Sequence, residues 1–71
     1  MQGNTRAHVG AVLIRKPEVL ARCGFSNSEL YRLIAAGKFP VAVPLGVRAV
    51  AWPLAEIDAW ISSRIAARGQ A

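Results

Sequence analysis

Cysteine and histidine are nearly missing from this chain of 71 residues, which contains one of each. The single Cys23 cannot form a disulfide within the molecule, and His8 has no cysteine or histidine partner at a metal-binding spacing. The sequence also lacks paired carboxylates in a plausible cleft, a nucleophile with a base, and a glycine-rich phosphate loop. We therefore expect no metal, no cofactor and no enzymatic activity.

Long apolar runs are also missing, although 54% of the residues are hydrophobic. No segment approaches the roughly 20 apolar residues that span a bilayer, and the first ten residues lack the apolar centre of a secretory signal. The sequence therefore predicts a protein of the reducing cytoplasm with no membrane association. Its length allows one small hydrophobic core.

Acidic residues are few, since four Asp and Glu stand against nine Lys and Arg, and the net charge is +5. Such an excess indicates either a polyanionic partner or scattered charge that only solvates the surface. The positions favour a partner, because three of the acids lie at predicted helix starts, where the helix dipole explains them. Most of the basic residues lie on or beside the predicted two-helix unit and hairpin: Arg15, Lys16, Arg22, Arg32, Lys38 and Arg48.

The segment 26–37 predicts a short helix with two different faces. Ser26 and Glu29 have the spacing of a capping box, in which each side chain bonds to a backbone N–H of the first turn. Gly37 suits a left-handed helix end, and Pro40 prevents the helix from resuming. At about 100° per residue one face is apolar and requires a core, formed by Leu30, Leu33 and Ile34. The outward side carries Ser28 and Arg32, with Tyr31 on its flank.

A shorter helix is predicted just before it, over residues 16–24. Pro17 occupies a favourable first position, Glu18 lies in the first turn, and Gly24 ends the helix. Residues 24–26 alone separate the two helices, which is the spacing expected of a helix-turn-helix. Phe25 is expected to cover the junction.

A β-hairpin is predicted next, because valines alternate with other residues from Val41 to Trp52. We expect Gly46 and Val47 to form a two-residue type II′ turn, which pairs Val43 with Val50 and Val41 with Trp52. Pro44 is tolerated at an unpaired edge. The tip of the hairpin then carries Arg48.

The last predicted helix begins near Pro53 and continues through Ile65. Its apolar stripe is formed by Leu54, Ile57, Ile61 and Ile65, with Trp60 at the margin. We expect Trp52 and Trp60 to close the core between hairpin and helix. The predicted organisation is a flexible N-terminal arm (1–11), one domain (12–66) and a C-terminal tail (67–71).

These segments resemble the AlpA-like regulators of prophages and integrative elements, within the winged helix-turn-helix proteins related to excisionases and the MerR group. The resemblance covers residues 13–65 and depends on Leu13-Ile14-Arg15-Lys16-Pro17-Glu18-Val19, Gly24-Phe25-Ser26, Ser28 with Leu30-Tyr31-Arg32-Leu33-Ile34, Gly37-Lys38-Phe39-Pro40, Leu45-Gly46 with Arg48-Ala49-Val50, and Trp52 with Glu56-Ile57-Asp58-Ala59-Trp60-Ile61. It implies a mainly α fold with a small β-hairpin, that is, three helices plus a wing. It also implies a DNA-binding regulator whose second helix enters the major groove and whose wing reaches the minor groove or backbone.

The chain departs from this family pattern at three positions. Asn27 stands where many relatives have a basic residue, Glu29 where they have Thr, and Val47 where the turn has a small or polar residue. The site preference of relatives is therefore not transferred to this chain.

The candidate DNA-binding residues lie on the second helix, after it, at the hairpin tip and at the start of the first helix: Asn27, Ser28, Tyr31, Arg32, Lys38, Arg48, Arg15 and Lys16. Alternatives stay open for several. Arg32 could bind guanine, bind phosphate or remain in solvent, and Tyr31 could contact DNA or cap the edge of the core. Arg15 and Lys16 could bind the DNA backbone or only solvate the helix start.

The expected partner is double-stranded DNA, bound by two or more copies side by side on repeated sites. The expected role is regulation of a prophage or integrative element, either as a transcriptional regulator or as an excisionase that assists an integrase. The alternative is a protein-interaction module that recruits an integrase or another partner. Either role belongs to the cytoplasm and nucleoid of a bacterium.

Overall fold

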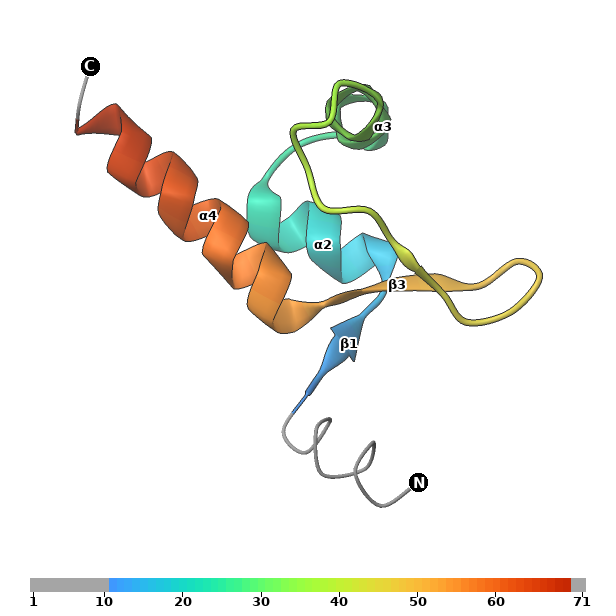
Figure 1. Cartoon of the computed structure of the whole chain (residues 1–71). Helices are drawn as coiled ribbons and strands as arrows, with labels where there is room; N and C mark the ends of the chain where they lie inside the picture. Colours follow the sequence, from blue (N-terminus) through green and yellow to red (C-terminus); the bar gives the residue numbers. More distant parts are fainter. Residues whose placement is uncertain (1–10, 70–71) are drawn as a thin grey trace.

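The computed structural model describes residues 11–69. The predicted arm up to residue 10, including His8, and residues 70–71 of the predicted tail lie outside the described residues. The elements follow one another as β1 (Leu13–Ile14), α2 (Lys16–Cys23), α3 (Asn27–Ala35), β2 (Val43–Pro44), β3 (Val50–Pro53) and α4 (Leu54–Arg68) (Figure 1). The predicted mainly helical fold with three helices and a β-hairpin is therefore confirmed for the described residues.

Both glycines predicted to end helices adopt the left-handed conformation. Gly24 follows α2 with a φ of 77°, and Gly37 follows α3 with a φ of 73°. After α3 the N–H of Gly37 donates to the Ile34 carbonyl at 3.0 Å and the N–H of Lys38 to the Leu33 carbonyl at 2.9 Å. This is a Schellman motif, which turns the chain sharply away from the helix axis.

The strands form a three-stranded antiparallel sheet in the order β1-β3-β2. The sequence did not predict β1, because a strand of two residues is too short to show an alternating pattern. In the sheet Leu13 pairs with Pro53 and Ile14 with Trp52. The edge position predicted for Pro44 is confirmed, since β2 pairs only with β3.

The predicted hairpin register is wrong by one residue. Val43 pairs with Ala51, and Pro44 with Val50. The turn is a three-residue loop, residues 46–48, closed by the N–H groups of Leu45 and Gly46, which both donate to the Ala49 carbonyl at 2.7 and 3.2 Å. A type II′ turn requires a positive φ at its first central residue, and Gly46 does not have one. We call residues 43–53 the wing.

The core lies between the helices and the sheet. Its buried residues come from every helix and from both β1 and β3: Ile14, Val19, Leu30, Phe39, Trp52 and Ile57. The Trp52 indole N–H donates to the Pro40 carbonyl at 2.9 Å, so the largest buried side chain has its polar atom satisfied. Val41, which was predicted to share the buried face of Trp52, is instead 70% exposed because it precedes β2.

Helix α4 continues to Arg68, two residues past the predicted end of the domain at residue 66. Ile57 is fully buried, whereas Ile65 is 53% exposed. The prediction that Ile65 belongs to the core stripe is therefore wrong. In Figure 1 the C-terminal end of α4 extends away from the other helices and the sheet, which agrees with the exposure of Ile65. Within residues 11–69, no helix combines the length and apolar character needed to cross a membrane.

Candidate nucleic-acid interface

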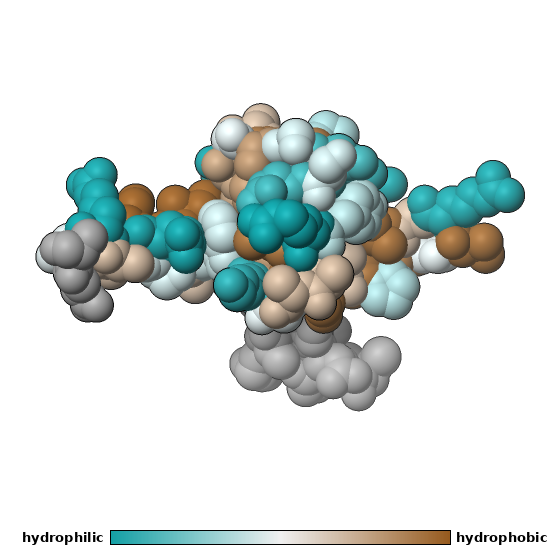
Figure 2. All heavy atoms as spheres, turned by 90° about the horizontal axis from the view of Figure 1, so that it is seen from above, coloured by the Kyte–Doolittle hydropathy of each residue, from teal (hydrophilic) through white to brown (hydrophobic). Residues whose placement is uncertain are grey.

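Helix α3 lies at one side of the molecule, and in Figure 1 it is seen end-on between α4 and the wing. Its first two residues, Asn27 and Ser28, are exposed, as is Arg32, and Tyr31 is 48% exposed. Its opposite side contributes Leu30 to the core, with Leu33 and Ile34 partly buried against it. Seen from above in Figure 2, the centre of the molecule is mainly hydrophilic, and hydrophobic and hydrophilic atoms mix on the projecting wing.

Of the two hydrogen bonds of the predicted capping box, only the one accepted by Ser26 is formed at the start of α3. The Ser26 hydroxyl oxygen accepts the Glu29 N–H at 3.1 Å. The predicted return bond from the Glu29 carboxylate to the backbone is not formed. Glu29 instead accepts two hydrogen bonds from Arg32, one of them from Nε at 2.9 Å. Glu29 and Arg32 are also three residues apart and therefore neighbours on the helix, so the carboxylate has a second partner within reach.

This ion pair changes the acidity of both groups. The hydrogen bond from Arg32 lowers the pKa of the Glu29 carboxyl below its ordinary value, and the same bond raises the pKa of the Arg32 guanidinium. Both groups are therefore charged at neutral pH, and the pair presents no net charge to a ligand. Arg32 remains in contact with solvent, since 64% of its side chain is exposed.

Tyr31 contacts Lys16 across the gap between α3 and the start of α2. The Lys16 ammonium donates to the Tyr31 hydroxyl at 3.2 Å and lies 5.1 Å from the ring centroid. The hydroxyl keeps its own proton available to an acceptor in solvent. Two of the predicted residues are thus one unit, which the sequence did not predict because they are 15 residues apart.

Arg15 also has a structural contact. Its Nε donates to the Val50 carbonyl at 3.0 Å, which ties the start of α2 to the wing. Beside this contact lies an open groove, which we call the wing-side groove. It is lined by residues from the start of α2, from α3 and from the wing: Arg15, Lys16, Pro17, Tyr31, Val47, Arg48 and Val50. Four of the eight predicted DNA-binding residues therefore lie around one groove.

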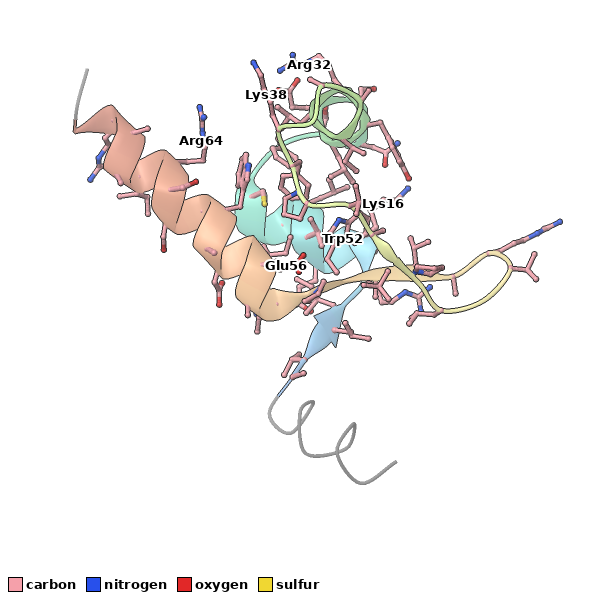
Figure 3. All side chains as sticks on the ribbon, viewed as in Figure 1. Lys16, Arg32, Lys38, Trp52, Glu56 and Arg64 are labelled. Atoms are coloured by element: carbon pink, nitrogen blue, oxygen red, sulfur yellow. The ribbon has the colours of Figure 1, made fainter. Side chains whose placement is uncertain are left out.

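A second groove, the α4-side groove, lies between α3 and α4. It contains the predicted residues Arg32 and Lys38, together with Glu29. Arg64 also lines this groove, although it is not among the residues predicted from the sequence. Figure 3 shows the side chains of Arg32, Lys38 and Arg64 on the same side of the molecule. Six of the eight predicted site residues thus divide between two grooves, and Asn27 and Ser28 line neither of them.

No group of three or more His, Cys, Asp or Glu within residues 11–69 is arranged to hold a metal ion. Cys23 is half-buried against the core, and burial raises the pKa of its thiol. A raised pKa leaves less of the reactive thiolate at neutral pH.

Two closely spaced helices followed by a β-hairpin and a third helix define a winged helix-turn-helix protein. The family model described as prophage CP4-57 regulatory protein (AlpA) matches residues 12–65. The chain therefore belongs to the AlpA family of prophage regulatory proteins, as the resemblance had implied.

The chain is also similar to the uncharacterized protein ORF88 of Enterobacteria phage P4. The two are 49% identical over 55 residues, which are 78% of this chain and 62% of the phage protein. The match thus spans less than two thirds of the phage P4 protein. No solved structure is significantly similar to the chain.

Proposed function

We propose that this protein binds double-stranded DNA through α3 and the wing and thereby regulates a prophage or integrative element. The observation that carries the proposal is the wing-side groove, because α2, α3 and the wing all supply basic or hydroxyl groups to it. Cations from separate elements around one groove suit the closely spaced phosphates of a duplex. Membership of a prophage regulatory family supports the same function.

In this proposal α3 enters the major groove and Asn27, Ser28 and Arg32 face the base edges or phosphates. The polar first turn of a helix suits contact with phosphate or with adenine. Arg48 at the wing tip contacts the DNA backbone or enters the adjacent minor groove. Lys16 and Tyr31 act together at a phosphate, with Lys16 supplying the charge and the Tyr31 hydroxyl a hydrogen bond.

A small domain covers only a short DNA site, so we expect two or more copies on repeated sequence. Two biological roles use these contacts, namely a transcriptional regulator at a promoter and an excisionase that assists an integrase at an attachment site. DNA footprinting across the genetic neighbourhood of the protein distinguishes them. Protection at a promoter supports the first role, and protection beside an attachment site supports the second.

Binding itself is tested with a labelled duplex of random sequence at increasing salt concentration. The logarithm of the association constant should fall by about 0.9 per neutralised phosphate for each tenfold rise in salt. An interaction that does not depend on salt, or no binding to any duplex, would exclude the proposal. The alternative of a protein-interaction module would then gain support from capture of an integrase without DNA.

A further inference from the structure

In the α4-side groove, Arg64 joins the predicted DNA-binding residue Lys38, and we call these two residues the cationic rim. Arg64 lies on α4 and Lys38 follows the end of α3, so they are 26 residues apart in sequence but line one open groove. Glu29 is the carboxylate in this groove, and it is already paired with Arg32. Among residues 11–69, the ion pairs are Arg22 with Glu18 and Arg32 with Glu29. Lys38 and Arg64 therefore form no ion pair within the described part of the chain.

The side chain of Trp60 contacts both the backbone of Lys38 and the side chain of Arg64. Its indole N–H donates to the Lys38 carbonyl at 2.8 Å, and the Arg64 guanidinium lies 5.8 Å from the centroid of the same ring. The ring is itself fixed by edge-to-face contacts with Phe25 and Phe39, with centroids 5.8 and 4.9 Å away. The aromatic cluster thus anchors the backbone of Lys38 and lies beside the Arg64 guanidinium, so both residues belong to one packed unit.

The two grooves lie on either side of α3, with the wing beside one and α4 beside the other (Figures 1 and 3). The major groove of B-DNA is about 12 Å wide, and a helix that enters it has one phosphate backbone on each side. The wing-side groove provides cations toward one backbone. The α4-side groove has cations on the other side of α3, where a helix in the major groove would face the second backbone.

We infer that Lys38 and Arg64 bind backbone phosphates of the DNA strand that flanks α3 on the side away from the wing. This inference rests on the proposed function and extends the interface to α4. The outward face of α3 carries the Glu29–Arg32 ion pair, which has no net charge. Phosphate contacts from Lys38 and Arg64 would still hold this helix in the major groove.

The test measures binding of a labelled random-sequence duplex of roughly 30 base pairs between about 50 and 200 mM salt. Arg64→Gln should weaken binding by about five- to tenfold near 100 mM salt and reduce the salt slope by about 0.9. Lys38→Gln should do the same. Arg64→Lys should bind within about twofold of the parent, because it keeps the charge.

Arg22→Gln is the matched control, since it removes the same charge from α2 outside both grooves. It should leave the salt slope unchanged. The inference is overturned if Arg64→Gln keeps the parental slope, or if Arg22→Gln lowers affinity as much, while the parent protein still binds DNA. If the parent protein binds no duplex, the inference falls together with the proposed function. Urea denaturation of each variant shows whether it is folded in the assay.

Discussion

At the scale of single residues, the pairing of Glu29 with Arg32 decides how much charge the outward face of α3 presents. Replacing the carboxylate frees Arg32 and removes a negative charge from the proposed interface. Glu29→Gln should therefore strengthen binding to duplex DNA by roughly two- to fivefold, the range expected for an exposed ion pair. Arg32→Ala should weaken it on the order of tenfold. Fluorescence anisotropy with one labelled duplex measures both, and weaker binding by Glu29→Gln would mean that the carboxylate orders the helix start for DNA.

The same pair predicts a pH dependence. The pKa of Glu29 is lowered in the folded protein. The ion pair therefore stabilises the fold fully at pH values above the pKa of this carboxyl in the unfolded chain. This stabilisation is lost as the pH falls through the pKa in the folded protein. The ordinary value is 4.5, and the midpoint of Glu29 should lie below it. In Arg32→Gln the midpoint should return toward 4.5. An NMR titration of the carboxyl groups checks both, and an identical midpoint in the two proteins would contradict the ion pair.

At the scale of elements, the end of α3 depends on one backbone conformation. A Cβ on Gly37 would meet no atom within 4 Å, so its φ of 73° is the obstacle to substitution. Gly37→Ala should lower the free energy of unfolding by roughly 1–2 kcal/mol, the cost of a left-handed residue with a side chain. Gly46→Ala is the control, since a Cβ there is equally free and its φ is not positive. Urea denaturation compares them, and equal stability of the two variants would show that Gly37 can leave this conformation.

The wing is the second element that the DNA hypothesis needs. Arg48 lies in the exposed loop 46–48, and it forms no ion pair within residues 11–69. Arg48→Ala should weaken binding about equally on specific and random duplexes and reduce the salt slope by about 0.9. The free energy of unfolding of this variant should not change, because substitutions of exposed residues usually alter it by less than about 0.5 kcal/mol. A loss confined to one DNA sequence would instead indicate that Arg48 contacts base edges.

At the scale of the whole molecule, α4 joins the core with its first half and leaves it with its second. Ile57 is fully buried, whereas Ile65 is 53% exposed. Ile57→Ala should lower the free energy of unfolding by about 2–5 kcal/mol, a large part of the roughly 5–15 kcal/mol of a small domain. Ile65→Ala, the matched substitution, should cost under about 0.5 kcal/mol.

Thermal or urea denaturation at several protein concentrations measures this difference. A large cost for Ile65→Ala that grows with protein concentration would show that the projecting end of α4 packs against a second copy. The prediction for Ile57 fails if its variant is as stable as the parent.

Much of the fold could be predicted from the sequence where the signal is local. Pro17, Gly24 and Gly37 mark the helix ends through their own backbone preferences, and the structure confirms these ends. The hairpin register could not be predicted in this way. It depends on hydrogen bonds from Leu45 and Gly46 to one carbonyl, and alternation fits either register nearly as well.

The candidate site shows the same division. The exposure of Asn27, Ser28 and Arg32 follows from helical periodicity, and their identity as DNA contacts stays a prediction. The contacts of Arg15 with Val50 and of Lys16 with Tyr31 join residues that are 35 and 15 positions apart. No local pattern indicates such pairs, because either side chain has many other rotamers open to it.

The sequence by itself determined the class of this protein, because capping residues, helical periodicity and closely spaced helices act within a few residues of chain. Tertiary structure alone decided which charges are available. Packing of α4 on the aromatic cluster brings Arg64 into the groove that Lys38 lines, and the contact of Arg15 with Val50 joins the start of α2 to the wing. Electrostatic interactions depend on distance in space, and the fold sets these distances.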